Sequence, residues 1–192
     1  MDSNFYKMSK SYYHEAFGHY RKCWAIEPNG YLWERGPIQN LPFEFRVLEF
    51  PPFGSRNMWT YATCCMSDLS CANPIELHIF SRNKDEGLIE LLTAITYYHR
   101  NTASLDLNHT VNFGKPWKNG SKCEHGLISL PYLDGRGLEN LQLLNTTVKF
   151  YWLIPITKGE VDYTKRYGVE SLEKMFEGPS FNYLDEVRRS IV

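Results

Sequence analysis

Three cysteines lie near one another in the sequence and are the first candidates for a reactive or metal-binding site: Cys64, Cys65 and Cys71. Cysteine thiolates hold structural zinc, typically as pairs of cysteines with two residues between them. Such pairs are missing here, and neighbours such as Cys64 and Cys65 would point to opposite faces of a strand. We therefore expect structural thiols, with no bound metal and no cofactor.

A second candidate group combines Cys123 and His125 with His109, which could form a ligand set or a Cys–His nucleophile pair. No residue pattern fixes a third member, and the segment that joins them is long and rich in turns. We favour His109 as a turn residue whose ring nitrogen bonds a backbone carbonyl. The carboxylates are scattered, and the sequence has no dinucleotide fingerprint, P-loop or nucleophile elbow. An enzyme is therefore not expected, and an unrecognised hydrolase is only the third alternative.

Large aromatic side chains in turn-rich stretches suggest a different kind of site, a surface that binds another protein. Such side chains make good interface anchors because they are large and rigid. A single tryptophan is nevertheless more often a core residue than an anchor. The loop over residues 108–122 is the first place to look for such an anchor. The residues that we expect to contact a partner are Trp33, Asp68, His109, Phe113 and Trp117.

The composition is that of an ordinary globular chain with many aromatic residues. The 192 residues are 43% hydrophobic, 22% charged and 15% aromatic. The net charge is −1 and no basic block occurs, which counts against binding to nucleic acid or to an anionic membrane. Residues 1–11 do not have the pattern of a signal peptide, and no stretch is long enough for a membrane span. The 5 cysteines, an odd number, favour reduced thiols and a cytoplasmic protein.

The elements that must position these residues can be predicted from capping signals and hydrophobic periodicity. Residues 9–17 are expected to form a helix, followed by an extended segment over residues 19–26. Residues 43–50 alternate as a strand that opens after a proline, and residues 59–65 are predicted to form a second strand. Residues 75–79 alternate apolar and polar side chains, which predicts a third, half-buried strand.

The second half of the chain contains the strand around which we expect the sheet to assemble. Residues 85–98 have the spacing of an amphipathic helix. Residues 148–154 are predicted to form this strand, and residues 150–154 are apolar at both odd and even positions, which is typical of a strand covered on both faces. Pro155 cannot donate a ladder hydrogen bond, so we expect regular pairing to fail there. Thr157 and Glu160 have the spacing of a capping box, so the central strand should run directly into a helix.

The remaining signals are a short strand over residues 127–130 and a final helix over residues 169–176. Strands follow one another with few helices between them. This order predicts a single α+β domain over residues 1–192, whose central sheet is largely antiparallel or mixed and has helices on its flanks.

Several of these segments together resemble one known family. The motifs are Phe43–Pro52 with its Pro-Pro end, Tyr61–Asp68, Ile75–Leu77, the helix Leu88–His99, Asn108–Thr110, Leu153–Ile156 followed by Glu160 and Gly168, and Arg188. In this order they are similar to motifs of the suppressor of fused family, and the chain looks most like its short, single-domain bacterial members. The resemblance covers about residues 43–189. One departure is Cys65, where the family usually has glycine; either the turn does not need a positive φ or this chain tolerates strain there.

The resemblance implies a protein-binding domain and not an enzyme. Single-domain bacterial members resemble immunity proteins, or antitoxins, that neutralise secreted polymorphic toxins, often nucleases. The expected partner is therefore a protein, most simply a cognate toxin, and no nucleic acid, membrane or small-molecule substrate is expected. The alternative is a scaffold or regulator that binds another cytoplasmic protein, as the signalling regulators of this family do.

Overall fold

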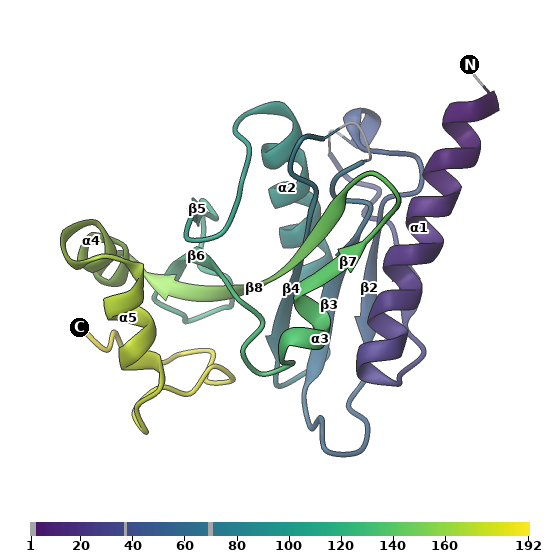
Figure 1. Cartoon of the computed structure of the whole chain (residues 1–192). Helices are drawn as coiled ribbons and strands as arrows, with labels where there is room; N and C mark the ends of the chain where they lie inside the picture. The colour runs from purple at the N-terminus through teal and green to yellow at the C-terminus, as the bar shows by residue number, and fades with distance from the viewer. Residues whose placement is uncertain (1–2, 37, 69–70) are drawn as a thin grey trace.

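The computed structural model describes residues 3–36, 38–68 and 71–192. Its strands are β1 (Asn29–Tyr31), β2 (Arg46–Phe50), β3 (Trp59–Cys64), β4 (Ile75–Ser81), β5 (Thr110–Asn112), β6 (Cys123–Ser129), β7 (Asn140–Gln142) and β8 (Thr147–Thr157). Its helices are α1 (Ser3–Trp24), η1 (Ile38–Asn40), α2 (Gly87–Asn101), α3 (Arg136–Glu139), α4 (Lys158–Tyr167) and α5 (Val169–Phe176). Figure 1 shows α1 at one end of the sheet, with α4 and α5 at the other. Among the described residues, no helix is both long and apolar enough to cross a membrane.

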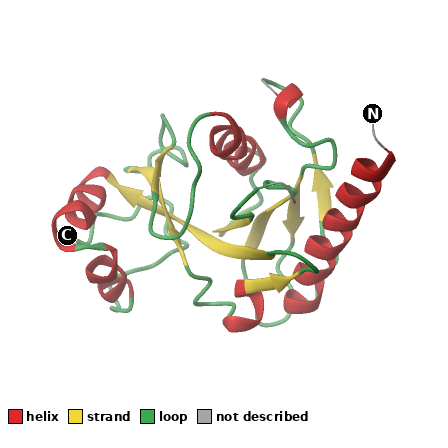
Figure 2. Cartoon of the chain, turned by 45° about the horizontal axis from the view of Figure 1, so that its top comes forward, coloured by secondary structure: helices red, strands yellow, loops and turns green. Residues whose placement is uncertain are grey.

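The strands described here form one sheet in the order β1-β2-β3-β4-β8-β6-β5, and β7 also pairs with β8. β4 and β8 are parallel, whereas the other pairs are antiparallel. The predicted α+β domain with a mixed sheet is therefore confirmed. The apolar run at residues 150–154 lies in β8, an interior strand of this sheet. Figure 2 shows helices packed around the yellow strands.

β8 changes its pairing partner along its length. Residues 149–152 pair with β4, whereas residues 152–157 pair with β6. The expectation that pairing fails at Pro155 is wrong, because Pro155 lies opposite Gly126 in β6. In an antiparallel strand, the N–H and C=O of one residue point to the same side. The Pro155 carbonyl points away from β6 and accepts a hydrogen bond from Arg188. The nitrogen of Pro155 points to the same side, where β4 no longer pairs with β8. The missing amide hydrogen therefore costs no hydrogen bond to β6.

The junction between β8 and α4 forms as predicted. The Thr157 hydroxyl accepts a hydrogen bond from the Glu160 amide at 3.2 Å, and Glu160 Oε2 accepts one from the Thr157 amide at 2.7 Å. This reciprocal capping box directs the chain out of the sheet into α4. α5 has the predicted bounds of 169–176. The predicted helix over 85–98 corresponds to α2.

The N-terminal helix differs most from its prediction. α1 continues to Trp24, so the helix predicted for residues 9–17 is too short and the extended segment predicted for residues 19–26 is wrong. The helix passes through Gly18, although glycine in a helix costs about 1 kcal/mol relative to alanine. Tyr20 and Trp24 are buried against the sheet, and their packing explains why the helix continues.

Two strand predictions are also corrected. The strand predicted for residues 43–50 is shorter, because β2 begins at Arg46. Phe43 lies outside the sheet and is 75% exposed. β4 is buried along its whole length rather than half-buried. Two of its polar residues face α1, since Glu76 accepts a hydrogen bond from Tyr12 and the His78 ring packs against Trp24. The opposite face contributes Ile75, Leu77 and Ile79 to the main core, which also contains the apolar residues of α2. β4 is therefore covered on both faces, which its alternating sequence does not predict.

Two aromatic clusters lie on the face of the sheet that α1 covers in part. The α1 cluster consists of Tyr20, Trp24, Phe50 and Phe150, whose rings lie 4.6–5.9 Å from a neighbour in the cluster. The C-terminal cluster consists of Phe80, Trp152, Phe176, Phe181 and Tyr183. Strand register puts the sheet residues of both clusters on one face.

Candidate protein-binding site

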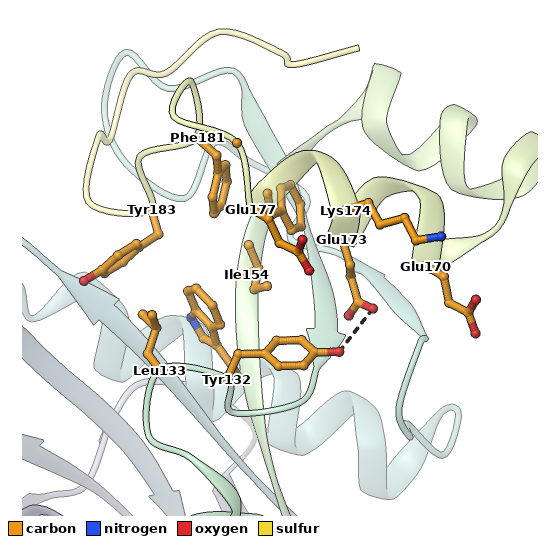
Figure 3. Close-up of a pocket in the computed structure, with 12 residues that line it drawn as sticks. Tyr132, Leu133, Ile154, Glu170, Glu173, Lys174, Glu177, Phe181 and Tyr183 are labelled. Atoms are coloured by element: carbon orange, nitrogen blue, oxygen red, sulfur yellow. Dashed lines mark hydrogen bonds between the residues drawn. The ribbon is translucent and has the colours of Figure 1, made fainter.

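An open cavity of about 700 Å³ lies between the end of β8, α5 and the segment that follows α5. We call it the C-terminal cavity. Its volume is in the range of ligand-binding pockets, about 300–1,000 Å³. The side chains around it are mainly aromatic or aliphatic on one side and acidic on the other, as Figure 3 shows.

The cavity exists because β8 separates from β4. Pairing between these two strands stops at Trp152, and Ile154 lies beyond the last paired residue. Trp152 and Ile154 form part of the cavity lining. The segment after α5 returns over this part of the sheet, where Tyr183 packs edge-on against Trp152 at 5.6 Å and Phe181 stacks on Phe176 at 4.2 Å. These rings surround the opening without filling it.

A buried ion pair fixes the returning C-terminal segment. The Arg188 guanidinium bonds both carboxylate oxygens of Glu160, at 2.6 and 2.8 Å, and also donates to the Pro155 carbonyl at 2.8 Å. Glu160 is fully buried and Arg188 is 7% exposed. Glu160 further accepts a hydrogen bond from the Ile191 amide at 3.1 Å. Because Glu160 also caps α4, one carboxylate links β8, α4 and the tail.

Asp134 fixes the loop that carries Tyr132 and Leu133, which line the side of the cavity away from α5. Its carboxylate accepts a hydrogen bond from Trp24 Nε1 at 2.7 Å and pairs with Arg56, and its Oδ2 lies 3.2 Å from His78 Nε2. Burial acts to raise the pKa of Asp134, but His78 and Arg56 outweigh it and hold the pKa at about 2. The Asp134 loop is therefore tied to α1 and the sheet, and the two residues before Asp134 face the cavity.

Those two residues, Tyr132 and Leu133, are 58% and 48% exposed. The Tyr132 hydroxyl donates a hydrogen bond to Glu173 at 3.4 Å, which crosses the cavity entrance to α5 (Figure 3). Glu173 also accepts a hydrogen bond from Ser129 of β6. Burial, and then the charge of Glu173, raises the pKa of Tyr132, so the hydroxyl stays protonated and able to donate.

α5 supplies a row of carboxylates to the cavity. Glu170, Glu173 and Glu177 recur at spacings of three and four residues, which places them along one face of the helix. Within the described ranges, neither Glu170 nor Glu177 has an ion-pair partner, and both are exposed. Lys174 is the basic residue among the lining side chains. The entrance is therefore apolar with an acidic side.

The predicted loop anchor is largely buried. Trp117 is 8% exposed and belongs to the main core. Phe113 is half-buried and lies over Gly126, where an added Cβ would come within 2.7 Å of the Phe113 ring. His109 is exposed, and its Nδ1 accepts a hydrogen bond from the Asp106 amide at 3.2 Å. His109 is therefore a turn residue whose ring nitrogen bonds the backbone, as predicted. The prediction that its partner is a carbonyl is wrong, because the partner is an amide.

The other predicted contact residues lie elsewhere. Trp33 is half-buried beside Phe43 in a separate hollow of about 420 Å³, with the Arg35 guanidinium 5.9 Å from its ring. Asp68 is half-buried and forms an ion pair with Arg100 at 2.7 Å. None of the predicted contact residues lines the C-terminal cavity. Their role in binding stays a prediction.

The cysteines that opened the sequence analysis are mostly buried. Burial raises the pKa of the Cys64 and Cys123 thiols, which makes them poor nucleophiles. Cys65 has a φ of 69°, so the family's glycine position does need a positive φ, and this chain meets it with a non-glycine residue. Cys71 is half-buried, and its thiol donates to Asp68 at 3.8 Å. Across the described ranges, no group of three or more His, Cys, Asp or Glu is arranged to hold a metal ion.

Sequence reasoning missed the cavity residues, although one signal for them was available. The spacing of Glu170, Glu173 and Glu177 on a predicted helix indicates an acidic face. Nothing local indicates that Phe181 and Tyr183, which follow a helix-ending Gly-Pro pair, return to cover the sheet. That return depends on the distant pair between Glu160 and the tail.

Comparison with known proteins gives a consistent result. Residues 42–189 match the family model for Suppressor of fused protein (SUFU). The structure is similar to that of a SUFU homolog from Neisseria gonorrhoeae FA 1090, with 31% identity and a TM-score of 0.82, over 95% of this chain and 98% of that chain.

Two more distant structures share the fold. The structure of the Sufu–Fu complex is similar at 15% identity and a TM-score of 0.68, over 94% of this chain and 92% of that chain. Drosophila Suppressor of Fused is similar at 16% identity and a TM-score of 0.54, over 77% of this chain and 42% of that chain. No curated protein matches the chain by sequence.

Proposed function

Because the chain belongs to the suppressor of fused family, we propose that it is a non-catalytic protein-binding domain whose partner is a cognate toxin. In this proposal it acts in the cytoplasm, where it neutralises the toxin by direct and stoichiometric binding. The observation that carries the protein-binding role is the C-terminal cavity, an open apolar hollow with an acidic side.

The fold supports protein binding as the class of activity. Sufu, which shares the fold, has been solved in a complex with Fu. At 15% identity this likeness concerns the fold, so we take from it neither the partner nor the interface. The Cys123 thiol is buried with a raised pKa, so it lacks the accessible, activated geometry that a Cys–His nucleophile pair requires, and His109 Nδ1 is occupied by the Asp106 amide.

The toxin as partner rests on the resemblance of this chain to short bacterial members of the family. A producing cell must keep almost every toxin molecule occupied, which requires nanomolar or tighter binding, about 12 kcal/mol or more. The net charge of −1 gives no broad electrostatic attraction. Most of that free energy must therefore come from a few buried apolar or aromatic anchors.

Co-expression tests this proposal. Where a toxin-like domain is encoded beside this gene, cells that express that domain should survive when they also express the native chain, and the two proteins should co-purify in equal amounts. Cell death in the presence of the folded, expressed chain would contradict the toxin role.

The alternative partner is another cytoplasmic protein that this chain scaffolds or regulates, and the Sufu–Fu complex favours it as a precedent of the same fold. The same experiment separates the two. If the chain binds a protein from its own cell in equal amounts but does not bind or neutralise the toxin-like domain, the regulatory role replaces the toxin role.

A further inference from the structure

We propose that the C-terminal cavity receives a short segment of the partner protein in which one large apolar side chain is flanked by lysine or arginine. This inference rests on the proposed function, because it names the chemistry that a partner of this domain must present. Three features of the cavity lead to it: its apolar lining, its carboxylates, which form no ion pair among the described residues and outnumber Lys174, and the exposed apolar residues beside it.

The apolar lining calls for a large side chain. Trp152, Phe176, Phe181 and Tyr183 surround the hollow, and the volume of about 700 Å³ is left between them. Aromatic and aliphatic anchors that fill such pockets contribute most of the binding free energy at protein interfaces. An apolar side chain of the partner would here replace water against these rings.

The carboxylates call for basic neighbours of that side chain. Glu170 and Glu177 have no ion-pair partner in the described part of the chain, and Glu173 is held by Tyr132 and Ser129 rather than by a cation. Lysine or arginine side chains can lay their apolar stems on the aromatic rings and place their charges at these carboxylates.

The position of Glu177 argues against a role for the acidic row in stabilising α5 itself. Glu177 is the C-cap of α5, at the end of the helix where the dipole disfavours a negative charge. Glu173 lies in the last turn of the same helix. Lys174 is the one basic residue that the same turn supplies, so these two carboxylates outnumber it, and a partner cation at this end would offset the remaining charge.

The surroundings of the cavity favour a protein segment over a small molecule. Small ligands bind in sites that bury most of their surface. Here Tyr132 and Leu133 remain 58% and 48% exposed at the entrance, so the apolar surface continues beyond the hollow. An extended peptide or a helix end can cover both the hollow and these two residues. A second copy of this chain is the competing occupant, and the experiment below distinguishes it.

The test uses a phage-displayed library of random short peptides, selected on the native full chain. Enriched peptides should carry lysine or arginine next to an aromatic or aliphatic residue. In calorimetric titrations, the double variant Glu170→Gln/Glu177→Gln should weaken their binding by roughly tenfold, the loss expected for about 1.4 kcal/mol. The weakening should shrink at high salt, because salt screens exposed charges.

Two further variants make the result specific. Phe181→Ala should abolish measurable binding, and its folding is checked by urea unfolding. Glu15→Gln is the matched control, because Glu15 is an exposed carboxylate on α1, and it should leave the affinity unchanged. The inference is overturned if no peptide is enriched, if enriched peptides carry acidic flanks, or if the cavity variants bind as tightly as the native chain. Self-association of the native chain that the same variants abolish would identify a second copy as the occupant and would also overturn it.

Failure here and failure of the proposed function are distinguishable. If the toxin-like domain binds and is neutralised, but the cavity variants bind it as tightly as the native chain does, the proposed function is supported and the cavity inference is wrong. If basic apolar peptides bind the cavity but the toxin-like domain does not, the cavity inference holds and the toxin role falls.

Discussion

The α1 cluster and the C-terminal cluster lie on the same face of the same sheet, yet one is closed and the other is open. On the α1 side, Tyr20 is fully buried and contacts both Phe50 and Phe150. On the C-terminal side, the rings surround a hollow of about 700 Å³. Both sides use aromatic residues, so composition alone does not distinguish a core from a binding site.

The difference lies in what covers each side. α1 has 22 residues, and its buried side chains Tyr12, Ala16, Tyr20 and Trp24 recur every four residues. α5 has 8 residues, and an irregular segment completes the cover. A long helix can fill the surface that it covers, whereas a short helix with an irregular return leaves space at the point where β8 departs from β4. Arg56 lies between the two sides, with its guanidinium 4.8 Å from the Trp24 ring and 5.5 Å from the Phe80 ring.

The largest expected effect is a loss of stability on the open side, when Arg188 is removed. Arg188→Ala leaves Glu160 as an unpaired buried charge and releases the tail, so the free energy of unfolding should fall by about 3–5 kcal/mol. Urea unfolding measures this change. Arg189→Ala is the matched control, because Arg189 is exposed, and it should stay within about 0.5 kcal/mol of the native protein. Equal losses for the two variants would show that the ion pair does not hold the tail.

A pair of phenylalanine truncations sharpens the comparison. Phe50 is fully buried, so Phe50→Ala should cost about 3–5 kcal/mol of unfolding free energy. Phe181 is half-buried beside an existing hollow, so Phe181→Ala removes fewer contacts and should cost less than half as much. Denaturant unfolding of both variants gives the ratio. A Phe181→Ala loss as large as that of Phe50→Ala would mean that the open side is as tightly packed as the closed side.

A third prediction concerns the pH dependence of the closed side. Glu76 is fully buried beneath α1, and burial raises its pKa to about 7 in spite of hydrogen bonds from Thr63, Tyr12 and the Met66 amide. The folded protein therefore binds this proton more tightly than the unfolded chain does. Its stability should fall as pH rises from about 4.5 to about 7, by about 3 kcal/mol.

The variant Glu76→Gln isolates this contribution. It cannot ionise, so the difference in unfolding free energy between the variant and the native protein should change over the same pH interval and stay constant above it. Urea unfolding at a series of pH values measures the difference. Parallel curves for the two proteins would show that Glu76 does not titrate in that interval.

The smallest expected effect is at Cys65, which has a positive φ beside the buried turn of the closed side. Glycine adopts this backbone conformation without strain, so Cys65→Gly should be neutral or stabilise by up to about 1 kcal/mol. Cys65 is only 3% exposed, and the loss of its buried thiol works against the gain. A destabilisation above about 2 kcal/mol would identify packing as dominant and would refute the strain argument.

The parts of this molecule that follow from the sequence are those with local causes. The capping box of Thr157 and Glu160, the bounds of α5 and the interior strand β8 depend on neighbouring residues and were predicted. The extension of α1 through Gly18 was not predicted, because packing of Tyr20 on the sheet decides it. The cavity was also missed, since it depends on where β8 leaves β4 and on the pair of Arg188 with Glu160, which are contacts between distant segments.

Hydrogen exchange tests the central claim, that a partner binds at the C-terminal cavity, most directly. Backbone amide exchange would be measured by mass spectrometry on the native chain alone and in complex with the co-purified toxin domain. We predict that binding slows exchange in residues 130–134 and 169–183, with little change in α1. Slowed exchange confined to residues 106–122 or to α1, with residues 169–183 unchanged, would contradict the claim.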